Sequence, residues 1–146
     1  MSAKSEEAVE RFKKGFNCSQ AILGTFSRQF GLDCDTACKV ATGFGGGMRM
    51  GSTCGAVTGA FMVIGLKYGN SAAKNKEGKA NTYKKIEEFT NRYKNRNDSV
   101  ICRELIGCDI CTPEGMKEAR DKDLFSTICR RIVQDSAEIL EEMLNE

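Results

Sequence analysis

The sequence predicts an all-α fold, a single-domain helical bundle over residues 1–146, with a central apolar helix after a glycine-rich loop. Apolar residues recur at spacings of three and four along most of the chain, which is the period of a helix with one buried face. Few segments alternate in the manner of strands, and Pro113 is the single proline. A chain of 146 residues buries about 70% of its unfolded surface, so one domain needs no disulfides.

Two rows of apolar residues predict helices in the N-terminal region. The rows are Val9, Phe12 and Phe16, and then Cys18, Ile22, Phe26 and Phe30. Gly15 and Asn17 lie between the rows and either divide this region into two helices or bend one. Asp33 and Asp35 are N-cap candidates for a further short helix, which ends near Gly43.

The glycine-rich segment 43–47 predicts a flexible loop before the central helix. Ser52 and Thr53 are N-cap candidates for that helix, which runs from Cys54 to about residue 67, with Gly69 as its stop. The helix is apolar all round, so we expect it at the centre of the bundle. Its small residues allow neighbouring helices or a ligand to approach closely.

The second half of the chain predicts three more helices. A charged segment, 74–79, leads into a long amphipathic helix with an apolar stripe of Tyr83, Ile86, Phe89 and Tyr93. Asn97, Asp98 and Ser99 cap a short helix over 100–106, which Gly107 ends. A polar stretch, 112–123, precedes the last helix, whose wide apolar face contains Phe125, Ile128, Ile132, Ile139 and Met143. The stripe and this face pack either within the chain or against a second copy, which would make a homo-oligomer.

Charge and hydropathy exclude several classes of partner. Lys and Arg total 22 against 20 for Asp and Glu, so the chain lacks the basic footprint of a nucleic-acid-binding protein. The N-terminus has no apolar signal segment, and the longest uncharged run, 51–66, is shorter than the roughly 18 residues of a membrane span. We therefore expect a cytoplasmic protein without a membrane span. In that reducing compartment the eight cysteines favour metal binding or redox work over structural disulfides.

The absence of histidine narrows the chemistry to thiols. With no histidine, the chain has no Ser-His or Cys-His pair and no His-ligated zinc. Cys54 is the leading candidate because it lies in the first turn of a helix, where backbone N–H groups and the helix dipole lower a thiol pKa. Its alternative role is that of a small apolar residue at a tight helix start.

Three further cysteines, Cys18, Cys102 and Cys129, lie on the apolar faces of their own helices. A buried free cysteine is common, but as a set these three are candidates to converge with Cys54 on one site. Four thiolates without imidazole suit a [2Fe–2S] or [4Fe–4S] cluster, or zinc. Alternatively, two of them cycle between dithiol and disulfide with Cys54 as the nucleophile. The residues leave these alternatives open.

Other cysteines and several glycines are secondary candidates for binding a metal or cofactor. Cys108 and Cys111 form a CxxC spacing, which suits a redox dithiol or half of a metal site, so both are metal-ligand candidates. Cys34 and Cys38 share a helix face. Gly46, Gly47 and Gly55 are cofactor-binding candidates because a residue without a side chain lets backbone approach a ligand or sulfur closely. The loop lacks the Lys-Ser/Thr ending of a P-loop.

Several segments together resemble the C_GCAxxG_C_C family of redox-active proteins. They are Asn17-Cys18-Ser19-Gln20-Ala21, the glycine loop with Cys54-Gly55-Ala56-Val57-Thr58-Gly59-Ala60, the run from Cys102 to Gly107, and Cys129. The resemblance implies a small, mainly helical prokaryotic protein with four characteristic cysteines, which by position are Cys18, Cys54, Cys102 and Cys129. It names no substrate and no electron donor, whether partner protein or small thiol, and leaves open whether the protein is an oxidoreductase. The alternative is a structural or interaction protein whose cysteines only pack or bind zinc.

Overall fold

The computed structural model describes residues 2–146, and all regular elements within them are helical. One isolated β-bridge joins Thr53 to Ile101. The α-helices are α1 (Ala3–Lys13), α2 (Cys18–Phe26), α3 (Cys34–Ala41), α4 (Gly55–Tyr68), α5 (Lys76–Asn97), α6 (Cys102–Ile106), α7 (Pro113–Asp121) and α8 (Arg130–Leu144). The predicted all-α fold is confirmed.

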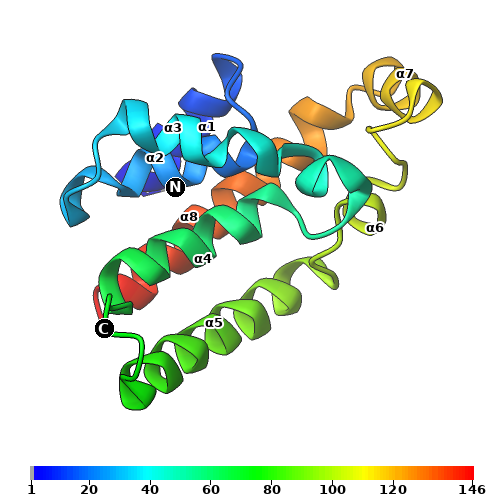
Figure 1. Ribbon diagram of the computed structural model, residues 1–146. Coiled ribbons are helices and arrows are strands. Elements are labelled where there is room, and N and C mark those ends of the chain that lie inside the picture. The colour runs from blue at the N-terminus through cyan, green and yellow to red at the C-terminus, as the bar shows by residue number, and fades with distance from the viewer. Residues whose placement is uncertain (1) are drawn as a thin grey trace.

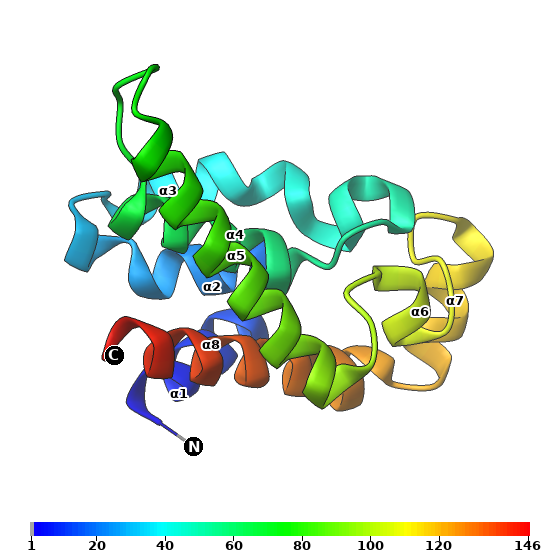
Figure 2. The ribbon, with the colours of Figure 1, turned by 90° about the horizontal axis from the view of Figure 1, so that it is seen from below.

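Helix α4 occupies the centre of the bundle, as its apolar sequence predicts. It packs against α2, α5 and α8, while α1 packs across α2 and α8 (Figure 1). Val57, Val63 and Ile64 of α4 are fully buried. Two views place α6 and α7 together at one end of the molecule (Figure 2). Within residues 2–146, no helix combines the length and the hydrophobicity that crossing a bilayer requires.

The N-terminal region is divided into two helices rather than bent. Gly15 adopts a left-handed φ of 111°, which an L side chain rarely adopts. Asn17 then caps α2: its side chain accepts from the Gln20 N–H at 2.9 Å, and the Gln20 side chain accepts from the Asn17 N–H at 2.9 Å. Asp33 caps α3 by accepting from the Thr36 N–H at 3.0 Å, as predicted.

The glycine-rich segment follows a tight, turn-like backbone path between two short helical turns, and its flexibility stays a prediction. Gly46 and Gly47 both have φ of 65°, and Met48 and Arg49 continue in the left-handed region at 61° and 57°. The glycines allow this path because they carry no Cβ, whereas each of the two following residues costs about 1–2 kcal/mol there. The segment is therefore a strained and defined connection into α4.

The residue that precedes α4 is Cys54, and neither Ser52 nor Thr53 caps the helix as predicted. The backbone of 52–54 is bound to the start of α6 instead: Cys54 N–H donates to Val100 O at 2.8 Å, and Cys102 N–H donates to Ser52 O at 2.6 Å. These two bonds hold the N-terminal ends of α4 and α6 side by side.

The C-terminal half contains one helix that sequence patterning missed. Helix α7 lies within residues 112–123, which the sequence pattern predicts to be a polar connection. Thr112 caps this helix by accepting from the Gly115 N–H at 3.0 Å, and Pro113 occupies its first position. Helix α6 starts two residues later than predicted. The last helix is α8, preceded by a wide turn, Phe125–Cys129, with π-type hydrogen bonds.

The two apolar surfaces that the sequence offers for self-association differ in how far they are buried within the chain. Ile132, Ile139 and Met143 of α8 are buried within the chain. Phe89 and Tyr93 of α5 are buried as well, but Tyr83 is 62% exposed. Intramolecular packing therefore accounts for the face of α8 and for the C-terminal half of the α5 stripe.

Two glycines of α4 provide a matched test of this packing. A Cβ on Gly59 would lie 2.9 Å from Ser19 O and 3.1 Å from Ile22 Cβ, whereas a Cβ on Gly65 would meet nothing within 4 Å. We expect Gly59→Ala to lower the free energy of unfolding by about 1–3 kcal/mol through overpacking. Gly65→Ala is expected to raise it by up to ~1 kcal/mol, because alanine favours the helix. Urea unfolding measures both; equal effects of the two substitutions would contradict the close α2–α4 contact.

Candidate thiol redox site

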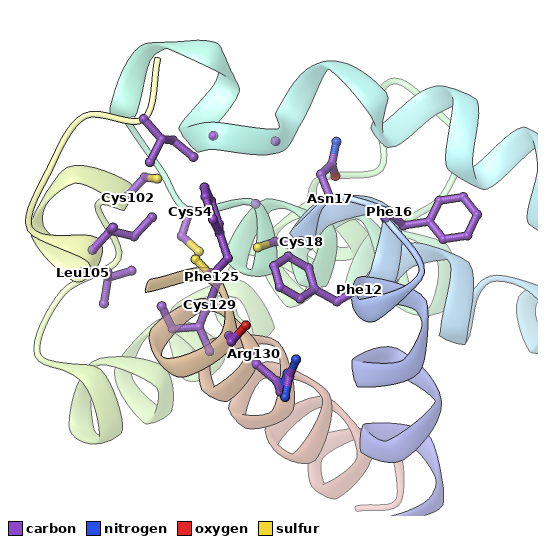
Figure 3. A pocket seen from close by; sticks show the side chains of 18 of the residues that line it. Phe12, Phe16, Asn17, Cys18, Cys54, Cys102, Leu105, Phe125, Cys129 and Arg130 are labelled. Carbon is purple, nitrogen blue, oxygen red and sulfur yellow. The ribbon is translucent and has the colours of Figure 1, made fainter. Parts of the chain in front are cut away.

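Four cysteines from four segments line one cavity of about 480 Å³. Figure 3 shows the side chains of Cys18, Cys54, Cys102 and Cys129 directed into it. Cys54, Cys102 and Cys129 are buried, and Cys18 is half-buried. The convergence that the helical faces predict is therefore present in the structure.

Three of the four cysteines lie at the N-terminal ends of helices. Cys18 is the first residue of α2, Cys102 is the first residue of α6, and Cys54 directly precedes α4. Cys129 instead lies inside a continuous helical run, at the junction of the π-type turn Phe125–Cys129 with α8. The N-terminal turn of a helix presents unpaired N–H groups and a partial positive charge, which stabilise a thiolate. The fold thus directs three helix ends at one cluster of sulfur atoms.

Glycines allow the cysteines to approach the backbone closely. A Cβ on Gly47 would lie 2.8 Å from the Cys102 Cβ, and one on Gly55 would lie 3.2 Å from the Cys18 Cβ. A Cβ on Gly46 would lie 3.4 Å from the Cys111 sulfur. Gly46 and Gly55 also line the cavity. These three predicted cofactor-binding residues each adjoin a cysteine, and in the structure they make room for thiols.

Cys18 and Cys129 are two cavity thiols whose pKa values are shifted in opposite directions by their interaction. The hydrogen bond with Cys129 raises the pKa of Cys18 well above its usual value, and burial adds to this rise. The same bond lowers the pKa of Cys129, against the opposing effect of burial. The Cys18 thiol therefore donates to the Cys129 sulfur, and Cys129 is the member of the pair that ionises first.

Cys54 has a raised pKa, opposite in direction to the sequence expectation. Burial is the largest cause, and it outweighs the backbone N–H groups of Ala56 and Val57 and the Tyr93 hydroxyl, which act in the opposite direction. The Tyr93 hydroxyl donates to the Cys54 sulfur at 3.7 Å. The helix end does stabilise the thiolate as predicted, but exclusion of water disfavours the charge more strongly.

Cys102 is also a protonated thiol. Burial raises its pKa to about 12, with smaller contributions from Cys54 and Cys129. At neutral pH it is therefore a thiol packed under Gly47. Cys129 is thus the one cavity cysteine whose pKa is lowered.

The other four cysteines lie outside this cavity. The Cys111 sulfur lies 3.3 Å from Gly46 O, and the Cys108 sulfur lies 3.5 Å from Gly115 O, so the two CxxC thiols contact different segments. Cys34 and Cys38 lie half-buried on α3; the guanidinium groups of Arg11 and Arg28 donate to the Cys34 sulfur at 3.6 and 3.5 Å.

The donor geometry does not fit a metal centre. Within residues 2–146, no group of three or more Cys, Asp or Glu side chains is arranged to hold a metal ion. Zinc and iron–sulfur clusters at Cys18, Cys54, Cys102 and Cys129, or at Cys108 and Cys111, accordingly remain predictions from the sequence.

Two functional neighbours were not identified from the sequence as part of this site. The sequence pattern places Tyr93 in the apolar stripe of α5 and so predicts a core residue. A buried tyrosine hydroxyl needs a hydrogen-bond partner, and this requirement was the one sequence signal for a role at the site. Arg130 follows Cys129 directly and lines the cavity. No sequence pattern distinguishes it from its neighbour Arg131, which is exposed.

Comparison with known proteins gives a family and no individual relative. No curated protein and no solved structure matches the chain significantly. The family described as "Putative redox-active protein (C_GCAxxG_C_C)" matches residues 16–143, which include all four cavity cysteines. The chain therefore belongs to the C_GCAxxG_C_C family.

Proposed function

We propose that this protein is a thiol–disulfide redox protein in which Cys18 and Cys129 form the working pair. The observation that carries the proposal is that both thiols line one cavity. Their interaction lowers the pKa of Cys129 and raises that of Cys18. A thiolate is the nucleophile in disulfide exchange, and a second thiol in the same cavity is placed to resolve the product. Membership in a family described as redox-active supports the same chemistry.

The proposed reaction consumes a disulfide, either of a small molecule or of a partner protein. The Cys129 thiolate attacks one sulfur of the substrate R–S–S–R, forming a mixed disulfide and releasing R–S⁻. The Cys18 thiolate then attacks the Cys129 sulfur, forming the Cys18–Cys129 disulfide and releasing the second R–S⁻. Each released thiolate takes one of the two protons that the cysteines lose. The two cysteines are thereby oxidised by two electrons and the substrate is reduced to two thiols.

In this proposal Cys54 and Cys102 remain reduced. Burial raises the pKa of both thiols, and each is held by its own backbone segment at the start of α4 or α6. Their contribution is to close the cavity around the pair, with Tyr93 behind Cys54.

Anaerobic purification followed by a redox titration tests the proposal. We expect two thiols to be lost in one reversible transition in a glutathione buffer, in a preparation with no stoichiometric metal. Iron with inorganic sulfide would overturn the proposal in favour of a cluster. Stoichiometric zinc without a reversible transition would overturn it in favour of the structural alternative, in which the cysteines only pack or bind zinc.

A further inference from the structure

The charged residues that line the thiol cavity are all basic. They are Lys13, Arg49 and Arg130, and no Asp or Glu is among the lining residues. Lys13 is paired with Glu10 at 3.3 Å on the exposed side of α1. Within residues 2–146, Arg49 and Arg130 have no ion-pair or side-chain hydrogen-bond partner. The cavity thus has two uncompensated guanidinium groups.

Arg130 contributes a buried donor without an acceptor. Its Nε atom is buried and has no hydrogen-bond partner in the described part of the chain. Leaving such a donor unpaired is unfavourable, and more so for a charged group. Arg130 and Cys129 line the same cavity, so an acceptor that satisfies this donor would be held in the cavity that contains the reacting thiol.

Arg49 is held at the cavity by a strained backbone. Its φ of 57° is left-handed, and its Nη1 atom lies 2.8 Å from the position of a Cβ on Gly46. The guanidinium group therefore lies over a residue that has no side chain to displace it, and a side chain at position 46 would exclude it. Strained residues of this kind persist where the surrounding structure fixes them, and they cluster at ligand sites.

The remaining walls are apolar. Phe12, Leu105, Ile110 and Phe125 line the cavity beside the cysteines. A volume of about 480 Å³ is within the ~300–1,000 Å³ range of small-molecule sites, which combine an apolar lining with a few polar groups. The cavity therefore offers an apolar body a place beside the sulfur atoms and offers an anionic group two arginines.

We propose that the cavity binds a negatively charged low-molecular-weight disulfide with an apolar body, whose anionic groups bind Arg49 and Arg130 while its sulfur atoms lie at Cys129. This inference rests on the proposed function and names its substrate class. The net reaction is the one above: the two cysteine thiols become a disulfide, and the bound disulfide leaves as two anionic thiols. A partner protein with an acidic segment around its disulfide is the competing source of the same charge.

Two aromatic disulfides of opposite character test the charge preference. Dithiobis(nitrobenzoate) carries carboxylates, and dithiodipyridine is uncharged at neutral pH. We expect Arg49→Gln and Arg130→Gln each to slow modification of Cys129 by the anionic probe about tenfold relative to the neutral probe, the loss expected for a hydrogen bond to a charged group. The ratio of the two rates cancels any effect of the substitutions on the thiol itself. Peptide mapping reads Cys129 separately from the other cysteines.

Arg131→Gln is the matched control, because Arg131 is the exposed neighbour of Arg130. This variant should leave the ratio of the anionic-probe rate to the neutral-probe rate unchanged. Added salt should lower the same ratio in the wild-type protein. An unchanged ratio in both cavity variants would overturn the substrate class while leaving the proposed function intact, provided that the neutral probe still modifies Cys129. Failure of both probes to modify Cys129 would overturn the proposed function itself. A preference confined to protein disulfides, with no reaction of the small anionic probe, would overturn the small-molecule assignment.

Discussion

Replacing Cys129 with serine is expected to abolish the reversible two-thiol transition of this protein. The variant lacks the thiol with the lowered pKa and therefore both the nucleophile and one half of the disulfide. A serine hydroxyl still accepts the hydrogen bond from Cys18, so we expect the far-UV circular dichroism to stay close to that of the wild type. Titration in glutathione buffers, with the remaining thiols counted by alkylation, measures the loss.

Cys54→Ser is the informative comparison for that experiment. It removes a buried thiol of the same cavity but leaves the Cys18–Cys129 pair in place, so the two-thiol transition should persist. Cys34→Ser, outside the cavity on α3, should behave in the same way. A variant of Cys129 that retains the full transition would contradict the assignment. Loss of the two-thiol transition in Cys54→Ser alone would identify Cys54 as the nucleophile instead of Cys129.

Removing the hydrogen-bond donor from Cys18 is expected to raise the pKa of Cys129. Cys18→Ala leaves no donor, whereas Cys18→Ser keeps a hydroxyl at the same position. At neutral pH, each unit of increase in the pKa lowers the thiolate fraction about tenfold; a more basic thiolate is also more nucleophilic, so the net loss of rate is about threefold. The pH–rate profile of Cys129 with iodoacetamide, read by peptide mapping, should therefore move to higher pH in Cys18→Ala only.

The serine variant makes this test specific to the hydrogen bond. Both substitutions remove the Cys18 thiol, so both prevent the disulfide, and a simple loss of packing affects both. Superimposed profiles for the alanine and serine variants would show that Cys18 does not set the pKa of Cys129. A profile for Cys18→Ser close to that of the wild type, with Cys18→Ala displaced upward in pH, is the expected pattern.

Local sequence signals predicted most of the fold because they act through short-range chemistry. Asn17 and Asp33 cap their helices with side chains that reach three residues ahead, and the apolar residues on all sides of α4 already indicate its central position. Helix α7 was missed because few of its residues are apolar, although Thr112 followed by Pro113 is a recognisable helix start. The tight path through Gly46 and Gly47 depends on contacts with the start of α6, which lie far away in the sequence.

The site was predictable as a set of residues and less so as a mechanism. Helical phase placed Cys18, Cys102 and Cys129 on inward faces, and the cavity they share with Cys54 bears this out. The pairing of Cys18 with Cys129 depends on how α2 and α8 pack, which no local pattern encodes. The direction of the pKa of Cys54 depends on the balance between burial and N–H donors, and burial follows from tertiary structure.

Disulfide mapping of the oxidised wild-type protein tests the central claim most directly. Cleavage after Lys and Arg leaves Cys18 in peptide 15–28 and Cys129 in peptide 123–130, each as the single cysteine of its peptide. After mild oxidation and trapping of free thiols, we predict a cross-linked species of these two peptides that reductant separates. A mixture in which both cysteines carry the trapping reagent, while another pair is cross-linked or none is, would contradict the Cys18–Cys129 assignment.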